Sequence, residues 1–280
     1  MTHAKFGGAD HDASTVRPGE PERRSQPPLS NRSGVRIDIE GLRKTFNGVP
    51  VLRCVDLHIE AGEVMVIVGG SGEGKSVLLR HIAGLERPDA GGIRLNGMDL
   101  HDYVRQPRDA KPFRFSMVFQ GSALLNSLTV GENVSLRLRE HRSHSETEIR
   151  RIVAACLEAV ELAGTEERLP SELSGGMRKR VAIARALAIE PQIILYDEPT
   201  ADLDPILTAQ IGALIKRIQD TRGATQVVVA HNLALAGEIG THIAVLHDGR
   251  IVDYQPAQSF SRSANAYTQE FIRAADLKLK

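Results

Sequence analysis

A glycine-rich run at residues 69–76 contains the residues best suited to chemistry in this chain. Its letters, GGSGEGKS, follow the phosphate-loop pattern, in which a glycine precedes a Gly-Lys-Ser/Thr triplet at a fixed spacing. Glycines let successive backbone N–H groups turn inward and surround phosphate oxygens. Lys75 would place a positive charge on the β- and γ-phosphates, and the Ser76 hydroxyl is a suitable Mg²⁺ ligand. The pattern predicts nucleotide binding, with a ligand-free glycine turn as the alternative.

The segments on either side of the loop have the patterns needed to position it. Residues 64–68, VMVIV, form a continuous apolar run with the length of a buried strand, and residues 76–82 have the pattern of a helix start. In a strand–loop–helix unit the helix N-terminus faces the phosphates, where its free N–H groups and its dipole favour negative charge. This context favours the phosphate loop over the glycine turn.

An acidic pair follows a second apolar run. Residues 193–196, IILY, precede Asp197 and Glu198. The strand would direct Asp197 toward Mg²⁺, directly or through water. Glu198 would then orient or deprotonate the water that attacks the terminal phosphate. An acidic turn after a buried strand is the alternative, and the phosphate loop in the same chain argues against it.

Two further polar residues follow predicted strands. Gln120 comes after residues 115–119, and its side-chain carbonyl would reach Mg²⁺ and the attacking water. His231 comes after residues 226–230 and would stabilise charge on the γ-phosphate in the transition state. Taken alone, each residue is more simply explained by a structural role. Their order along the chain, relative to the other motifs, decides between a structural and a catalytic role.

The composition excludes several classes of function. Lys plus Arg and Asp plus Glu both number 35, so no net field attracts the chain to nucleic acid or to an anionic membrane. Trp is absent and aromatic residues make up 4% of the chain, which argues against a surface on which the bases of single-stranded nucleic acid stack. Cys54 and Cys156 form no metal-binding or disulfide pattern. The absence of an apolar run of about 20 residues and of a signal sequence predicts a protein that is soluble or is held at a membrane by another component.

The chain alternates predicted strands and helices after a polar N-terminal segment. Residues 1–34 are rich in Gly, Pro, Ser and Arg and predict a disordered tail, with arginine contacts to lipid or RNA as the alternative. Strands are predicted at residues 35–39, 51–59, 64–68, 93–95, 115–119, 193–196 and 226–230, with a hairpin at 243–253. Helices are predicted from the Ser145–Glu148 capping box to near Gly164, at 175–189, at 205–222, and from about 266.

A second glycine-containing motif, LSGGM, occupies residues 173–177 at the start of a predicted helix. Ser174, Gly175 and Gly176 would present a hydroxyl and unshielded N–H groups at the positive end of that helix. Such an element binds phosphate. The chain therefore contains two phosphate-binding elements for one triphosphate.

The order of these motifs resembles that of the ATP-binding cassette (ABC) family, from about residue 35 to the C-terminus. LSGG between the two nucleotide motifs is the signature of that family. The resemblance implies an α/β fold: a P-loop NTPase ABC cassette with a RecA-like mixed sheet core, an antiparallel β subdomain and an α-helical signature subdomain. After the disordered tail predicted from composition at 1–34, it implies an ABC ATPase domain at 35–265 with its helical subdomain at about 121–185, and a C-terminal helix at 266–280.

The resemblance also assigns roles to individual residues. Catalysis would fall to Glu198, His231, Gln120 and Lys75, and Mg²⁺ would bind Ser76, Gln120 and Asp197. Contacts to ATP would come from Phe46, Gly69, Gly70, Ser71, Gly72, Glu73, Gly74, Lys75, Ser76, Val77, Ser174, Gly175, Gly176 and Asp204. Phe46 would stack on adenine, with a buried core phenylalanine as the alternative. In the family, the two phosphate-binding elements meet across a head-to-tail dimer, with the D-loop, residues 201–204, at the dimer seam.

Several segments resemble one branch of that family, the Mla/Mce-type lipid-transport ATPases. They are residues 76–82 (SVLLRHI), 119–124 (FQGSAL), 132–134 (ENV), 138–141 (LREH) and 174–180 (SGGMRKR). This resemblance implies an ATP-hydrolysing subunit that moves phospholipid or another hydrophobic compound through a separate permease. Its implied partners are a second cassette in a homodimer, transmembrane permease subunits and an MCE-domain lipid-binding protein, with no nucleic acid. The implied location is peripheral, on the cytoplasmic face of the inner membrane.

Two alternatives and a few departures accompany this prediction. In the first alternative, the chain is the ATPase of a transporter for another cargo, such as amino acids. In the second, it is a soluble non-transport cassette that acts on ribosomes or DNA. A single cassette without sustained heptads argues against the second. Gly70 and Glu73 stand where the family often has proline and serine, Asp202 stands where it has a small residue, and Met177 replaces a frequent glutamine.

Overall fold

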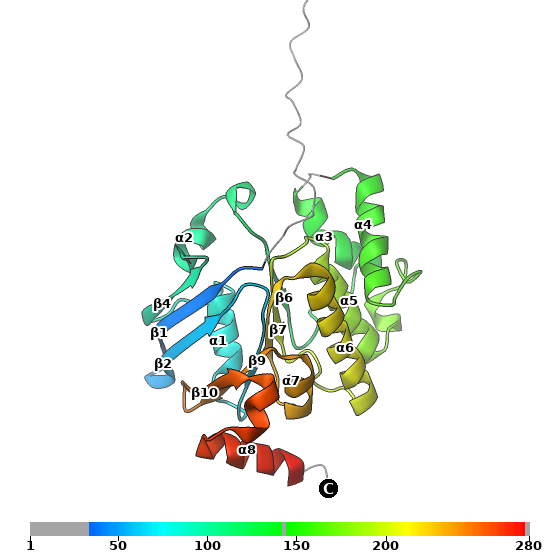
Figure 1. Ribbon diagram of the computed structural model, residues 1–280. Coiled ribbons are helices and arrows are strands. Elements are labelled where there is room, and N and C mark those ends of the chain that lie inside the picture. Colours follow the sequence, from blue (N-terminus) through cyan, green and yellow to red (C-terminus); the bar gives the residue numbers. More distant parts are fainter. Residues whose placement is uncertain (1–33, 142–143, 278–280) are drawn as a thin grey trace, which may run out of the picture. The chain divides into compact units, whose positions relative to one another are not determined.

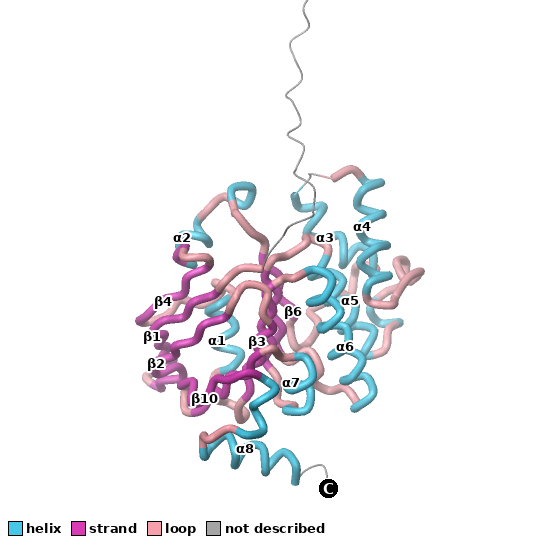
Figure 2. Tube along the Cα trace, viewed as in Figure 1, coloured by secondary structure: helices cyan, strands magenta, loops and turns pink. Residues whose placement is uncertain are grey.

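The computed structural model describes residues 34–141 and 144–277 (Figure 1). Apart from Gly34, the predicted N-terminal tail lies outside the described residues. The described part contains two sheets, with helices packed against them (Figure 2). The α/β cassette architecture predicted from the sequence, with a mixed core sheet, an antiparallel sheet and a group of helices, is confirmed.

The larger sheet has six strands in the order β10-β9-β3-β8-β7-β6. Neighbouring strands run parallel except for β10, which pairs antiparallel with β9 at one edge. The strands are β3 (Val64–Val68), β6 (Phe115–Val118), β7 (Ile193–Asp197), β8 (Thr225–Val229), β9 (His242–His247) and β10 (Arg250–Pro256). The predicted hairpin at residues 243–253 is confirmed as β9 and β10.

Strand β3 is buried on both faces, which explains its continuous apolar sequence. Val64, Val66 and Val68 belong to one hydrophobic core, and Met65 and Ile67 belong to a second core on the other face. All five side chains are at most 1% exposed. The sheet therefore separates two cores, and the loop after β3 starts from a rigid position.

One core packs the main group of helices against the six-stranded sheet. These helices are α3 (Val130–His141), α4 (Glu146–Ala159), α5 (Gly175–Leu187), α6 (Pro205–Arg222) and α7 (Leu233–Ile239). Helix α6 has the predicted bounds, with a proline at its first turn and Gly223 at its C-cap. The capping box of Ser145 and Glu148 is confirmed at α4, which ends at Ala159 rather than near Gly164.

The second core joins the opposite face of the same sheet to α1 (Lys75–Ile82) and to the antiparallel sheet. That sheet has the order β2-β1-β4-β5, and Figure 1 shows α1 close behind it. Its strands are β1 (Ile37–Phe46), β2 (Val49–Ile59), β4 (Ala90–Leu95) and β5 (Met98–Asp99). Strand β1 extends beyond the predicted residues 35–39, with irregular pairing along its second half.

Short elements complete the described chain. They are α2 (Leu100–Arg105), α8 (Ala266–Leu277) and the 3-10 turns Arg108–Ala110, Pro170–Glu172 and Ala257–Arg262. Helices α2, α3 and α7 are not among the predicted elements. No helix within residues 34–141 and 144–277 combines the length and apolar character that a bilayer crossing requires.

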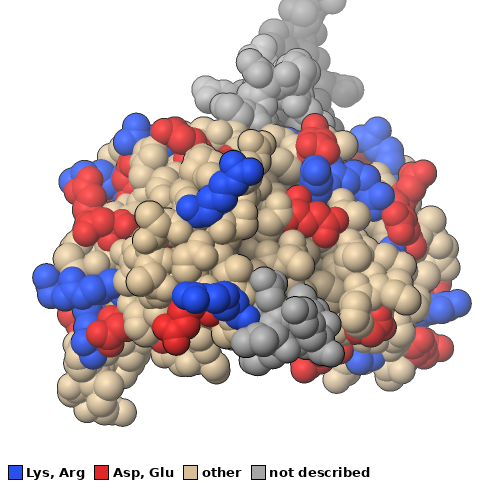
Figure 3. Space-filling model, turned by 60° about the horizontal axis from the view of Figure 1, so that its bottom comes forward, with Lys and Arg blue, Asp and Glu red and all other residues tan. Residues whose placement is uncertain are grey.

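The charged surface agrees with the balanced composition. On the face shown in Figure 3, Lys and Arg side chains alternate with Asp and Glu across the surface, without a broad area of one sign. This face has no extended basic track among the residues that the structure describes.

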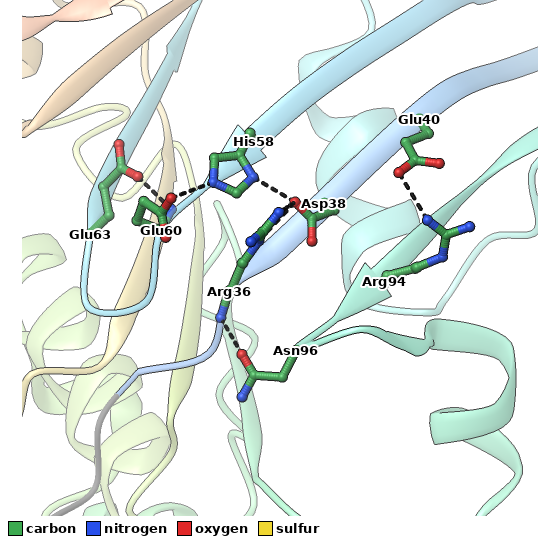
Figure 4. A network of polar contacts seen from close by, with 8 residues as sticks. All are labelled: Arg36, Asp38, Glu40, His58, Glu60, Glu63, Arg94 and Asn96. Carbon is green, nitrogen blue, oxygen red and sulfur yellow. Dashed lines mark hydrogen bonds and ion pairs between the residues drawn. The ribbon is translucent and has the colours of Figure 1, made fainter.

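A polar network on the antiparallel sheet centres on His58 of β2 (Figure 4). Its Nδ1 lies 2.5 Å from Asp38 Oδ1, and its Nε2 lies 2.6 Å from Glu60 Oε1. Arg36 also bonds to Asp38, at 2.9 Å. The hydrogen bond to Glu60 raises the pKa of His58, burial opposes this, and the bond to Asp38 adds to the increase.

This network predicts a pH-dependent contribution to stability. Because the folded pKa of His58 lies above the ordinary histidine value of 6.5, the stabilisation is complete below pH 6.5 and disappears as the pH rises through the folded pKa. We expect His58→Gln to lower the free energy of unfolding by up to about 1 kcal/mol at about pH 5.5, and by clearly less at about pH 9. Urea unfolding of both proteins at both pH values measures this.

His101→Gln provides the matched control, because it makes the same change at an exposed histidine near the start of α2. An equal loss of stability at both pH values in His58→Gln would contradict the assignment.

Candidate nucleotide-binding and catalytic site

Four adjacent strands of the large sheet end at one edge, and each is followed by predicted site residues. The phosphate loop follows β3, His231 comes after β8, Asp197 and Glu198 lie at the end of β7, and Gln120 comes after β6. Because these strands are parallel neighbours, their carboxyl ends meet at the same edge. In open α/β sheets this edge is where ligands bind.

The phosphate loop requires glycine for two different physical reasons. A Cβ on Gly69 would lie 2.2 Å from the carbonyl oxygen of Leu246, so the close approach to β9 leaves no room for a side chain. Gly74 has a φ of 95°, in the left-handed region, and forms the N-cap of α1. No side chain caps α1, which leaves the N–H groups of its first turn available to an anion.

Lys75 lies inside the loop and is only 4% exposed. Its ammonium donates hydrogen bonds to the carbonyl oxygens of Gly69, at 3.0 Å, and Gly70, at 2.7 Å. Burial lowers the pKa of Lys75, although the charges of Glu198, Glu73 and Asp197 oppose this decrease. The loop thus holds a cation on acceptors that phosphate oxygens can replace.

Ser76 and Asp197 connect the two nucleotide motifs directly. The Ser76 hydroxyl donates to Asp197 Oδ1 at 2.7 Å. A hydroxyl oxygen beside a carboxylate oxygen fits Mg²⁺, which usually takes one or two protein ligands and completes its shell with water and nucleotide phosphates. Among the described residues, no cluster of three His, Cys, Asp or Glu side chains could hold a metal by itself. The residues present therefore suit an ion that arrives with the nucleotide.

Glu198 and His231 form a close pair at the same edge. His231 Nε2 lies 2.5 Å from Glu198 Oε1, and the Glu198 side chain is 15% exposed. The Glu198 backbone N–H donates to Val229 O at 3.0 Å, which ties the residue to β8. Glu198 has a φ of 48°, an uncommon conformation for a residue with a side chain. Such local strain occurs where a side chain must point in one direction.

The LSGGM motif starts α5 as predicted. Ser174 is its N-cap and its hydroxyl accepts a hydrogen bond from the N–H of Met177 at 3.3 Å. Ser174 and Gly175 are exposed, whereas Gly176 is buried. A Cβ on Gly176 would lie 3.1 Å from the Leu207 side chain, so the second glycine of the motif allows α5 to pack closely on α6.

The D-loop residues have local structural roles. Asp204 is the N-cap of α6, and its carboxylate accepts from the N–H of Leu207 at 2.9 Å. Asp202 is exposed and has a φ of 63°, a left-handed conformation that aspartate adopts more readily than most residues with a side chain. The predicted contact of Asp204 with ATP stays a prediction.

The remaining predicted ATP contacts divide by exposure. Phe46 is 36% exposed, so the alternative of a buried core phenylalanine is wrong. The ammonium of Lys44 lies 5.1 Å from the centre of its ring. Ser71 and Gly72 are exposed, whereas Gly70, Glu73 and Val77 are half-buried. Phe46 is exposed, and its predicted stacking on adenine stays a prediction.

Comparison with known protein families identifies the family to which the chain belongs. A family model described as ABC transporter matches residues 52–201. The chain belongs to the ABC transporter family. It is an ATP-binding subunit of that family and hydrolyses ATP.

Other ABC proteins resemble this cassette over most of its length. It is 39% identical over 239 residues to the "Probable ribonucleotide transport ATP-binding protein mkl" of Mycobacterium leprae, an alignment that covers 85% of this chain and 69% of that protein. It is 38% identical over 259 residues to "Protein TRIGALACTOSYLDIACYLGLYCEROL 3, chloroplastic" of Arabidopsis thaliana, covering 87% of this chain and 75% of that protein. These two names differ in the compound they mention.

A solved structure shares the fold of this cassette. It is described as a dimeric post-hydrolysis state of the ATP-binding cassette MJ0796 bound to ADP and Pi. The TM-score is 0.71 at 34% sequence identity, and the match covers 79% of this chain and 98% of that one.

The ABC cassette contains a contact that was not predicted from its sequence, between Lys179 of α5 and Gln120. The Lys179 ammonium donates to the backbone carbonyl oxygen of Gln120. Lys179 is only 6% exposed. Burial lowers the pKa of Lys179, while the charges of Asp202 and Glu198 oppose the decrease. The only signal in the sequence was the basic run MRKR after the two glycines.

Arg185 of α5 makes a second connection to the same segment. Its guanidinium donates to the carbonyl oxygens of Ser122, at 2.8 Å, and Ala123, at 2.6 Å. Both residues have a left-handed backbone, with φ values of 64° and 47°. Lys179 and Arg185 thus hold the residues after β6 against the signature helix in a conformation that the backbone disfavours.

Lys179→Met tests whether this connection positions Gln120. Methionine keeps the length of the side chain but removes the donor to the Gln120 carbonyl oxygen. We expect kcat for ATP hydrolysis to fall several-fold and the melting temperature to stay the same or rise, because replacing a buried charge with an apolar group is often neutral or stabilising.

Steady-state ATPase kinetics together with thermal unfolding measure both effects. Lys179→Arg keeps a donor and should retain most of the activity. If both variants lose thermal stability and kcat falls in proportion, Lys179 has a purely structural role.

Proposed function

We propose that this ABC ATPase drives a transporter that moves phospholipid or another hydrophobic compound through a separate permease, at the cytoplasmic face of the cell membrane. The single observation that carries its catalytic part is the meeting of Lys75, the Ser76–Asp197 pair and the Glu198–His231 pair at one edge of the sheet. The lipid cargo rests on the resemblance of residues 119–124 and 174–180 to the Mla/Mce branch and on the glycolipid in the name of the Arabidopsis relative.

The proposed division of labour follows from this geometry. The N–H groups at the start of α1 bind the phosphates, and Lys75 moves from the loop carbonyls to the β- and γ-phosphate oxygens. Glu198 orients a water molecule, whose oxygen forms a bond to the γ-phosphorus as the bond to the bridging oxygen breaks. The proton of that water passes to Glu198, and His231 holds the carboxylate in place.

The remaining site residues act around this centre. Ser76 and Asp197, with the Gln120 side chain, would hold Mg²⁺, which would neutralise charge on the β- and γ-phosphates. Phe46 would stack on the adenine. These side chains come from separate elements, so correct strand order is needed before any of them can act.

A second cassette would complete the site. Helix α1, after the phosphate loop, and helix α5, after Ser174, pack on opposite faces of the six-stranded sheet. This supports an arrangement in which exposed Ser174 and Gly175 of one chain contact the triphosphate held by another. The dimeric form of the MJ0796 cassette supports the same arrangement.

Glu198→Gln tests the assignment of the catalytic base. The amide keeps the shape of the side chain but accepts a proton poorly, so ATP should bind normally and turnover should fall by about 10² to 10³. Lys75→Ala is the comparison variant, because it should weaken nucleotide binding itself. Nucleotide titration, single-turnover hydrolysis and gel filtration with ATP separate the two effects, and normal turnover in Glu198→Gln would refute the base assignment.

Isolation of the native complex tests the cargo. A C-terminal affinity tag on the chromosomal copy should recover a permease and an MCE-domain lipid-binding protein from detergent-solubilised membranes, with co-purified phospholipid detected by mass spectrometry. Recovery of a permease with an amino-acid-binding protein would replace the lipid assignment. Recovery of ribosomes or DNA would show a non-transport cassette.

A further inference from the structure

The phosphate loop contains a carboxylate, Glu73, in a segment that has to bind a polyanion. The Glu73 side chain is 20% exposed and does not point freely into solvent. Its Oε1 lies 3.0 Å from His247 Nδ1, and its Oε2 accepts from the N–H of Asp248 at 2.6 Å. Since a carboxylate only accepts, Nδ1 of His247 is the donor. Both oxygens of Glu73 are thus occupied by the turn between β9 and β10.

The donor His247 is in turn covered by the C-terminal helix. Its ring stacks on Tyr267 of α8, with ring centres 3.7 Å apart and an angle of 15° between the rings. Tyr267 stacks on Phe271 one turn later, at 6.2 Å. Burial raises the pKa of Tyr267, and the negative charge of Glu73 adds to the increase. Glu73, His247 and Tyr267 therefore form one contiguous set.

Helix α8 is fixed to the sheet at its start. Thr268 Oγ1 donates to Asp253 Oδ2 at 2.7 Å, and the Asn265 side chain donates to the Val252 carbonyl oxygen at 2.8 Å. Thr268 is fully buried. Because Asp253 and Val252 belong to β10, these bonds hold Tyr267 at a set position over the β9–β10 turn.

The turn itself is fixed on its other side by β2. Arg53 pairs with Asp248 at 2.8 Å, and its backbone N–H donates to the Gly249 carbonyl oxygen at 2.8 Å. His247 thus has a supported turn beneath it and an aromatic ring above it. A side chain held on both sides can act as a rigid donor to the phosphate loop.

We propose that Glu73, His247 and Tyr267 form a brace that holds the phosphate loop in its ATP-binding shape and keeps the Glu73 carboxylate directed away from the phosphates. His247 and Tyr267 are positioning residues in this brace, since they act through Glu73. The brace makes ATP affinity depend on the C-terminal helix. The proposal concerns the ATP site alone and does not depend on which cargo the transporter moves.

The brace has a physical basis in the cost of an unpaired charge. Without His247, the Glu73 carboxylate loses a donor and is free to turn toward the triphosphate, where like charges repel. A hydrogen bond to a charged group contributes enough for its loss to weaken binding by about tenfold. The Glu73→Ser variant has no charge to restrain, so the same loss of His247 should then have no effect on ATP affinity.

Isothermal titration of the full chain with Mg²⁺ and a non-hydrolysable ATP analogue tests the brace. We expect His247→Ala to weaken binding by about five- to tenfold. Glu73→Ser should bind at least as tightly as the wild type, and Glu73→Ser/His247→Ala should bind like Glu73→Ser. His247→Asn places an amide N–H near the position of Nδ1 and should restore most of the affinity.

Tyr267→Leu extends the test to the C-terminal helix and serves if His247→Ala fails to fold. It should weaken binding by about two- to threefold in the wild type and leave Glu73→Ser unchanged. His58→Ala is the matched control, because it removes a histidine bound to carboxylates elsewhere and should leave the affinity unchanged.

Two results would overturn the brace. One is an unchanged affinity in both His247→Ala and Tyr267→Leu. The other is an equal loss of affinity in the wild-type and Glu73→Ser backgrounds, which would show that His247 acts on the nucleotide by another route.

Discussion

Burial of strand β3 on both faces is the constraint on which the rest of the structure depends. Its alternating side chains fill two separate cores, and its backbone pairs with β8 on one side and β9 on the other. A strand held in this way cannot shift, so the loop that follows it starts from a fixed point. The phosphate loop needs that support, because its glycines have little stiffness of their own.

Several polar side chains of the site are bonded to groups of the protein itself. Lys75 bonds to loop carbonyls, Ser76 bonds to Asp197, and Glu198 pairs with His231. Buried polar groups without partners are costly, so these contacts stabilise the folded arrangement of the site. Each partner is also one that phosphate oxygens, a metal ion or a water can replace. These contacts therefore hold each side chain at the edge of the sheet through partners that a ligand can displace.

The sequence predicted the elements with strong patterns and missed those with weak ones. Helix α6, with a proline at its start and a glycine after its end, was predicted with its observed bounds. Helix α2 has six residues and α7 has seven with an internal glycine, which is too short for a helical period to emerge. Helix α3 has apolar residues at Val130, Val134 and Leu138, but serine, asparagine and glycine between them lower its helical propensity.

By itself, the sequence determined which residues could bind phosphate and in what order they occur, because glycine loops and acids after apolar strands are local patterns. Only the tertiary structure decided which side chains meet. Glu73 bonds to His247, and Lys179 bonds to the carbonyl of Gln120, although each pair is far apart in the chain. Such contacts depend on strand order and on the packing of α5 and α8. Local spacing contains no information about these, since they arise from the burial of apolar faces that belong to distant segments.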